Sequence, residues 1–187
     1  MYNKYMNAVS VIYRAIEQEY SARIHYGKLI GALIAIVYIV HAIQTPQEFH
    51  IISTVNLIFH EAGHTLATFF GKFIHFIAGS AMQVIVPLVI AGYFFLKREF
   101  YSSGIIIMWM GQSLVDVSVY MGDAQRMVLP LLGGDSVEHD WNTLFSMFGI
   151  LEYTDQIANA TYFVALAIVL CGIGLTLVCS RSERVDG

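Results

Sequence analysis

Long apolar runs separated by short polar breaks fill the chain beyond residue 28. Five of them approach the roughly 20 mostly apolar residues that a helix needs to cross a bilayer. These runs are residues 29–44, 51–70, 80–96, 104–121 and 156–179. Stop signals follow several of them, such as Thr45-Pro46 after the first, because a proline disfavours helical geometry in the residue before it. The pattern predicts an all-α, polytopic membrane protein with about five transmembrane helices.

Three segments fall outside these runs. In residues 1–28, apolar residues recur at spacings of three and four among charges, which predicts an amphipathic helix on the membrane surface. Residues 141–151 are apolar but too short to cross, so we expect a short interfacial or re-entrant helix, with a sixth transmembrane helix as the alternative. Residues 181–187 form a polar tail. The expected organisation is one transmembrane domain over 29–180, between the surface helix and the tail.

The composition agrees with a membrane protein. Of 187 residues, 57% are hydrophobic and 13% are charged, which is about half of the charged share in soluble domains. These values exclude a water-soluble globular domain and a disordered chain. Ten basic against 14 acidic residues also exclude a nucleic-acid binder, which needs a basic surface. We therefore expect an integral membrane protein in contact with lipid.

Basic residues set the expected orientation, because cytoplasmic loops carry an excess of lysine and arginine. Five alternating spans with a cytoplasmic N-terminus place six basic residues inside, namely Lys4, Arg14, Arg23, Lys28, Lys72 and Arg126. The other four, Lys97, Arg98, Arg181 and Arg184, fall outside. Six against four favours the cytoplasmic N-terminus, and the count becomes eight against two if residues 141–151 also cross.

Residues 60–64 read His-Glu-Ala-Gly-His, an H-E-x-x-H pattern inside the second apolar run. Two histidines at i and i+4 share one helical face and can converge on a Zn²⁺ ion at ~2.0–2.1 Å. Glu61 between them can take a proton from a metal-bound water, whose pKa zinc lowers to roughly 7. An unpaired charge at this depth costs at least ~2.5 kcal/mol, which favours a functional site. The alternative is a helix-packing hydrogen-bond cluster with a protonated Glu61.

A catalytic zinc needs a third protein ligand. In the five-span topology the second run ends on the side to which the fourth returns, so Asp116, Asp123 and the polar segment 122–140 lie on the metal's side. We place His139 first, because it is the last histidine of the chain and precedes Trp141, a typical membrane-interface residue. Asp123, Asp116 and Asp140 follow as candidates, although Asp140 also suits the start of a helix as its capping residue.

Other polar residues in the apolar runs have weaker interpretations. Gln83 can hydrogen-bond a metal ligand or the substrate backbone, or join two helices. Asn56, one turn before His60, can support the ligands or simply pack. For His41, His50 and His75 we expect interfacial or helix-packing roles.

The motifs together resemble the site-2-protease class of intramembrane zinc metallopeptidases, peptidase family M50, and are more closely similar to small bacterial M50B-like membrane proteins. The matching pieces are HEAGH (60–64), GSAMQVIVP (79–87), YMGDA (120–124), LPLLGG (129–134) and HDW (139–141). The resemblance implies His60 and His64 as zinc ligands, Glu61 as the general base, and the bacterial inner membrane as the location. Site-2 proteases take their third ligand from a later L-D-G motif, which this sequence lacks. The third ligand therefore stays open.

The expected function is a zinc metalloprotease that hydrolyses a peptide bond of a transmembrane or membrane-anchored protein near the cytoplasmic face. The alternative is a non-catalytic membrane subunit of a larger complex, in which the HEAGH site holds a structural metal or none. A closed shell of four protein ligands would favour that alternative. A metal or proton transporter is disfavoured, because the polar groups gather on one side and form no path across the bilayer.

Overall fold

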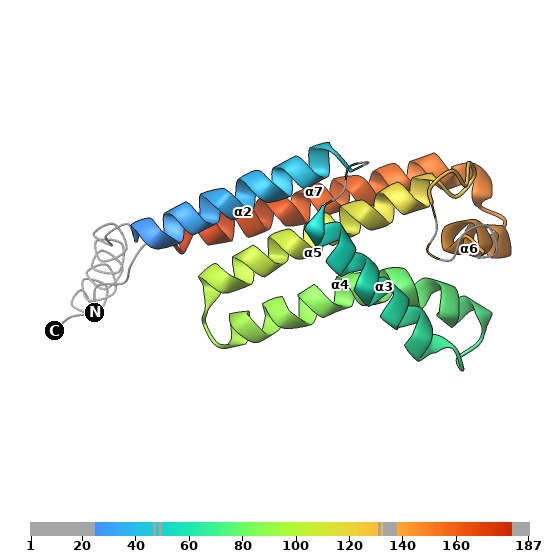
Figure 1. Cartoon of the computed structure of the whole chain (residues 1–187), viewed down its shortest axis with the longest axis horizontal. Coiled ribbons are helices and arrows are strands. Elements are labelled where there is room, and N and C mark those ends of the chain that lie inside the picture. The colour runs from blue at the N-terminus through green and yellow to red at the C-terminus, as the bar shows by residue number, and fades with distance from the viewer. Residues whose placement is uncertain (1–24, 47, 49, 131, 133–137, 181–187) are drawn as a thin grey trace, which may run out of the picture.

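The computed structural model describes residues 25–46, 48, 50–130, 132 and 138–180, and their regular structure is entirely helical (Figure 1). The elements are α2 (Tyr26–Gln44), α3 (Ile51–Ala67), α4 (Lys72–Leu96), α5 (Phe100–Gly122), α6 (Asp140–Phe148), the 3₁₀ turn η2 (Leu151–Tyr153) and α7 (Thr154–Val178). The predicted all-α class is confirmed. Of the surface helix predicted over 1–28, residues 1–24 lie outside the described residues, and residues 26–28 already belong to α2. The predicted polar tail, 181–187, also lies outside the described residues.

Four of the described helices are long and apolar enough to cross a membrane: α2, α4, α5 and the continuous η2–α7 segment. Helix α4 begins at Lys72, eight residues before the run predicted at 80–96, and it continues through Pro87. Helix α6 has nine residues, which is too short to cross, as predicted. Helix α3 has 17 residues, or about 26 Å at 1.5 Å per residue, against a hydrocarbon core of about 30 Å.

Helix α3 advances in the same sense as α5 and does not fold back along α2, which is the arrangement that the predicted return of residues 51–70 called for. Near the start of α2, the backbone oxygen of Lys28 accepts a hydrogen bond from Tyr101, near the start of α5. Farther along, the ring of His60 on α3 lies 5.8 Å from the ring of Tyr120, near the end of α5. Both helices therefore advance in the same sense as α5, but α2 lies along α5 whereas α3 crosses it obliquely (Figure 1).

A polar break, rather than a reversal, joins α2 to α3. The hydroxyl of Thr45 donates to the backbone oxygen of His41, at 2.8 Å. The Nε2 atom of His50 lies 2.9 Å from the backbone oxygen of Thr45, and since a carbonyl only accepts, His50 is the donor. Unpaired backbone groups cost several kcal/mol within a bilayer, so these bonds stabilise the interruption. The sequence shows where α2 stops but not in which direction the chain continues.

The bundle has two ends, which differ in the helix termini that meet there. At one end, which we call the His25 end, the amide of His25 donates to the backbone oxygen of Ser180 at 3.1 Å, so α2 begins where α7 finishes. At the other, which we call the α6 end, the C-terminal part of α3 meets the start of α4, the end of α5 and α6 (Figure 1). Lys28 and Lys72, predicted on one side of the membrane, therefore lie at opposite ends.

Close packing of small residues fixes α5 against α7. A Cβ atom on Gly111 would lie 2.5 Å from Cγ2 of Val169, closer than real contacts allow. Gly104 and Gly172 are equally confined between the two helices. Such small residues let membrane helices approach closely. The closely packed α5–α7 pair carries the polar residues of α5 that face α3 and α6.

Candidate metal centre

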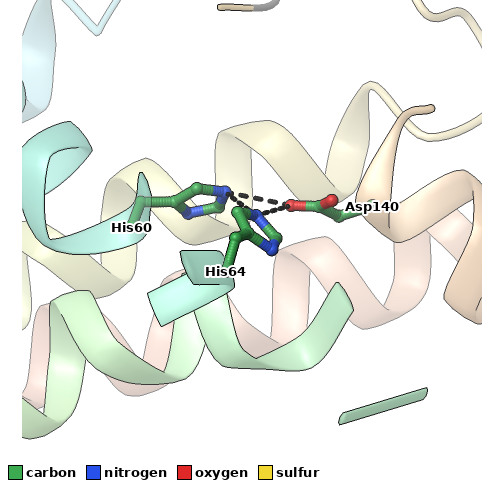
Figure 2. Close-up of side chains that lie close together, drawn as sticks. All are labelled: His60, His64 and Asp140. Atoms are coloured by element: carbon green, nitrogen blue, oxygen red, sulfur yellow. Dashed lines mark hydrogen bonds and ion pairs between the residues drawn. The ribbon is translucent and has the colours of Figure 1, made fainter. Parts of the chain in front are cut away.

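Three ligand atoms from two separate helices converge at the α6 end (Figure 2). Nε2 of His60 and Nε2 of His64 lie 2.9 and 3.0 Å from Oδ2 of Asp140, and 3.0 Å from each other. His60 and Asp140 are buried, and His64 is half-buried. Among the described residues, His60, His64 and Asp140, which we call the metal group, lie close enough together to hold a metal ion.

The two histidines are brought together by α3 alone. They lie four residues apart, so one helical turn stacks them on the same face, with ring centroids 4.7 Å apart. Asp140 comes from the first residue of α6. Its amide donates to the hydroxyl of Tyr120 at 3.1 Å, which ties the start of α6 to the end of α5.

The other ring nitrogen of His60 has an acceptor of its own. Nε2 of Gln83 donates to the backbone oxygen of Ser113, which assigns the remaining amide atom, Oε1, as an acceptor. That oxygen lies 3.1 Å from Nδ1 of His60, so the ring proton lies on Nδ1. Gln83 therefore hydrogen-bonds a candidate ligand and also joins α4 to α5, which are two of the three alternatives predicted for it.

A backbone oxygen plays the same part for His64. Nδ1 of His64 lies 2.8 Å from the backbone oxygen of His75, which can only accept. A neutral imidazole carries one ring proton, so Nε2 of both His60 and His64 presents a lone pair. Sequence reasoning missed this contribution of His75, because a carbonyl acceptor leaves no signature in the residue type.

Three lone-pair atoms within 3.0 Å of one another repel unless a cation lies between them or a proton joins one imidazole. Ligand atoms around a tetrahedral zinc at ~2.0–2.1 Å are about 3.3 Å apart, close to the spacing here. Burial raises the pKa of the Asp140 carboxyl, but its contacts with His60 and His64 outweigh burial and bring the pKa below its ordinary value. The donor set therefore fits a divalent cation.

Gly79 leaves the space in which the two imidazoles meet. A Cβ atom at this position would lie 2.5 Å from Nε2 of His64 and 2.7 Å from Nε2 of His60. Any larger residue on α4 would thus push against the two ligand nitrogens. The sequence contains a motif around Gly79, but only the packing of α4 on α3 shows that this glycine leaves space for the two imidazoles.

A cavity of about 400 Å³ adjoins the group, and both histidines and Asp140 line it. Glu61, the predicted base, lines the same cavity. The cavity extends from Pro46, at the α2–α3 break, to Pro130, beyond the end of α5. A ligand in the cavity would therefore meet the three candidate ligands and Glu61 together.

Asp116 belongs to a separate polar network on the cavity wall. Trp109 can only donate, and its Nε1 donates to Oδ1 of Asn56 at 2.8 Å, which fixes the orientation of that amide. Nδ2 of Asn56 and Nε2 of Gln112 then each donate to the Asp116 carboxylate at 2.8 Å. Asp116, a predicted third-ligand candidate, thus accepts bonds from α3 and α5 and stays outside the metal group.

Asp123 and His139 stabilise the connection between α5 and α6. The Asp123 carboxylate accepts bonds from the amides of Val128 and Leu129, and it lies 3.5 Å from Nε2 of His139. Burial lowers the pKa of His139 more than the neighbouring carboxylates of Asp123 and Asp140 raise it.

Of the four predicted candidates for the third ligand, the structure brings Asp140, which was placed last, to the two histidines, whereas His139, which was placed first, is not part of that group. His139 is the N-cap of α6, since its Nδ1 accepts from the amide of Asn142 at 3.2 Å. Asp140, predicted as the capping residue, is the first helical residue and points to His60 and His64. The preference of aspartate for N-caps misled the sequence argument, because histidine is not a usual cap.

Comparison with known proteins adds no relative: no family model, no curated protein and no solved structure matches the chain. The case for a function therefore depends on the residues and geometry of the site itself.

Proposed function

We propose that this chain is an integral membrane zinc metallopeptidase of the M50 type, which hydrolyses a peptide bond of a transmembrane or membrane-anchored protein. One observation carries the proposal: two imidazole lone pairs and a carboxylate meet on the wall of a cavity that Glu61 also lines. Two histidines, one carboxylate and an open fourth position form the ligand set of hydrolytic zinc sites. The histidine tautomers, fixed by Gln83 and the His75 carbonyl, support that assignment.

The chain's own residues supply the proton transfers. Zinc, when bound, would lower the pKa of a coordinated water to roughly 7 and polarise the scissile carbonyl. Glu61 takes a proton from the attacking water as its oxygen adds to the carbonyl carbon, and gives that proton to the nitrogen as the C–N bond breaks. His60, His64 and Asp140 keep their positions through hydrogen bonds to Gln83, the His75 carbonyl and Tyr120.

We infer that α2 and α3 together make one interrupted crossing, so that the chain crosses the membrane four times rather than five. Both helices advance in the same sense along α5, and this, together with the hydrogen-bonded break at Thr45 and His50, supports the inference. Irregular backbone inside a bilayer is tolerated where it lines a cavity, and Pro46 of this break lines the cavity described above.

The test uses the full chain in detergent, with zinc content and cleavage measured separately. The probe is a synthetic transmembrane helix with a glycine-proline break and a fluorophore–quencher pair. We expect wild type to bind one zinc and cleave the probe, and Glu61→Gln to bind zinc with cleavage reduced at least 100-fold, because general-base catalysis contributes 10²–10⁴-fold. Undiminished cleavage by Glu61→Gln would contradict the mechanism. Stoichiometric zinc without cleavage by wild type would favour the non-catalytic subunit.

A further inference from the structure

The hydrogen-bond network around Asp116 has a fixed direction. Trp109 donates to Oδ1 of Asn56, so Nδ2 of Asn56 is the donor to Oε1 of Gln112, at 2.8 Å. The remaining amide atom of Gln112, Nε2, is then a donor as well. Nδ2 of Asn56 reaches one oxygen of Asp116 and Nε2 of Gln112 reaches the other, each at 2.8 Å. Both carboxylate oxygens are therefore acceptors at the end of the network, which suits an ionised carboxylate.

No basic side chain neutralises this carboxylate within the described part of the chain. None of the ion pairs found there includes Asp116, and the described residues that line the cavity contain no lysine or arginine. Asp116 is half-buried and lines the cavity itself. An ionised carboxylate has about four acceptor sites, of which Asn56 and Gln112 occupy two. Acceptor sites thus remain for a positively charged group inside the cavity.

The Asp116 carboxylate lies about one helical turn from the metal group. On α3, Asn56 precedes His60 by four residues, and on α5, Asp116 precedes Tyr120 by four, so each pair shares a helix face. The ring of Tyr120 lies 5.8 Å from that of His60, and its hydroxyl accepts from the amide of Asp140. Four residues of helix rise about 6 Å, which two residues of an extended peptide also cover, at ~3.2–3.4 Å each.

We propose that Asp116 forms a specificity subsite, which binds a cationic side chain of the substrate, lysine or arginine, two or three residues from the scissile bond. This inference rests on the proposed function, because it names the substrate class of the same cavity. Asn56 and Gln112 are buried and hold the carboxylate in place. Charge complementarity of this kind gives specificity. The substrate class is therefore a membrane protein with a basic residue close to the scissile bond.

The test compares matched probes on the full, zinc-loaded chain in detergent. Each probe is the transmembrane helix with the glycine-proline break, and it has one lysine at a position from three residues before the break to three residues after it. Its partner has norleucine at that position, which keeps a straight carbon chain without the ammonium group. Mass spectrometry of the products locates the scissile bond. Affinity is measured separately, by fluorescence anisotropy of each probe on chains that carry Glu61→Gln.

We expect lysine on one side of the scissile bond, two or three residues away, to raise kcat/KM at least 10-fold over norleucine in wild type. Close charge pairs across an interface commonly couple by that factor or more. Asp116→Asn should bring the ratio to about one, whereas Asp155→Asn, at an exposed position of α7, should keep it. A wild-type ratio near one at every position would overturn the proposal, and so would a ratio that survives Asp116→Asn.

The binding measurement separates this proposal from the proposed function. If no probe is cleaved but lysine still tightens binding tenfold, and Asp116→Asn removes that gain, the proposed function fails and the subsite stands. If the probes are cleaved without any preference for lysine, the proposed function stands and the subsite fails. The comparison of lysine with norleucine in wild type needs no substitution of Asp116, so it decides the matter even if Asp116→Asn does not fold.

Discussion

Gly79 contributes no atom to the metal group, but it leaves the space in which the two imidazoles of that group meet. A methyl group there would lie within 2.7 Å of both ligand nitrogens. A methyl group at position 79 would act on the two imidazoles by steric contact. This effect can be separated from any general effect that an added methyl group has on the stability of α4. Gly92, in the same helix, provides that comparison, because a methyl group on it would meet no atom within 4 Å.

We expect Gly79→Ala to lower zinc content from one ion per chain to near zero, while Gly92→Ala keeps it. Both substitutions gain about 1 kcal/mol of helix propensity, so this effect cancels in the comparison. Metal analysis of the two purified variants by mass spectrometry decides the matter. Full zinc occupancy in Gly79→Ala would show that the ion binds elsewhere.

Gln83 offers a second prediction for a single residue. Its Oε1 atom accepts from Nδ1 of His60, and loss of such a partner of a metal ligand typically weakens metal binding 10–100-fold. We expect that loss in Gln83→Leu and a much smaller one in Gln83→Glu, which keeps an acceptor. Competition with a fluorescent chelator measures both affinities. Equal affinities for Gln83→Leu and wild type would argue against the tautomer assignment.

At the scale of elements, α3 is attached to α5 mainly through polar groups. Asn56 accepts from Trp109 and donates to Gln112 and Asp116. Asn159, on α7, is exposed and provides a neutral comparison for the same substitution. A leucine at position 56 would leave the Trp109 donor without its acceptor and would remove one of the two donors to the Asp116 carboxylate.

An unsatisfied buried polar group costs about 1–3 kcal/mol, so we expect Asn56→Leu to be destabilised by at least that amount and Asn159→Leu by less than about 0.5 kcal/mol. Unfolding in detergent, followed by circular dichroism against increasing sodium dodecyl sulfate, measures the difference. Identical transitions for the two variants would mean that the network does not stabilise the docking of α3.

Hydrophobicity predicted the elements better than their directions. The apolar runs located α2, α4, α5 and α7, because the length and polarity limits of a crossing are set by the bilayer itself. The direction of α3 depends on hydrogen bonds at Thr45 and His50 that no apolar count records. The ligand pair His60 and His64 followed from helical spacing. Asp140 did not, because adjacent residues at a helix start point about 100° apart, and the sequence does not say which one is the cap.

At the scale of the whole molecule, the metal group joins parts of the chain that are distant in sequence. His60 and His64 belong to α3, whereas Asp140 begins α6. A bound ion would therefore act as a cross-link between these two helices in the folded state alone. Ligands that bind only the folded state add stability, about 2.7 kcal/mol at 100 times the dissociation constant.

We expect a metal chelator to lower the thermal transition of the wild-type chain by roughly 5–10 °C, since 1 kcal/mol corresponds to about 2–4 °C for a chain of this size. Asp140→Asn, which loses the anionic ligand, should show little further change with chelator. Differential scanning fluorimetry in detergent measures both transitions. If the chelator leaves the transition temperature of the wild-type chain unchanged, metal binding does not stabilise the folded state.

The interrupted crossing that we propose for α2 and α3 would also affect how deep the two histidines lie in the bilayer. Helices α2 and α3 contain 19 and 17 residues, or about 54 Å of helix at 1.5 Å per residue, for a hydrocarbon core of about 30 Å. The surplus is taken up by the oblique course of α3 (Figure 1). His60 and His64 are separated by about 6 Å along the helix axis, and the obliquity makes their difference in depth smaller than that. Counting residues from the end of a span would therefore overestimate the depth of the two histidines in the membrane. Both histidines would then be able to bind a metal ion that acts on a peptide at a single level of the membrane.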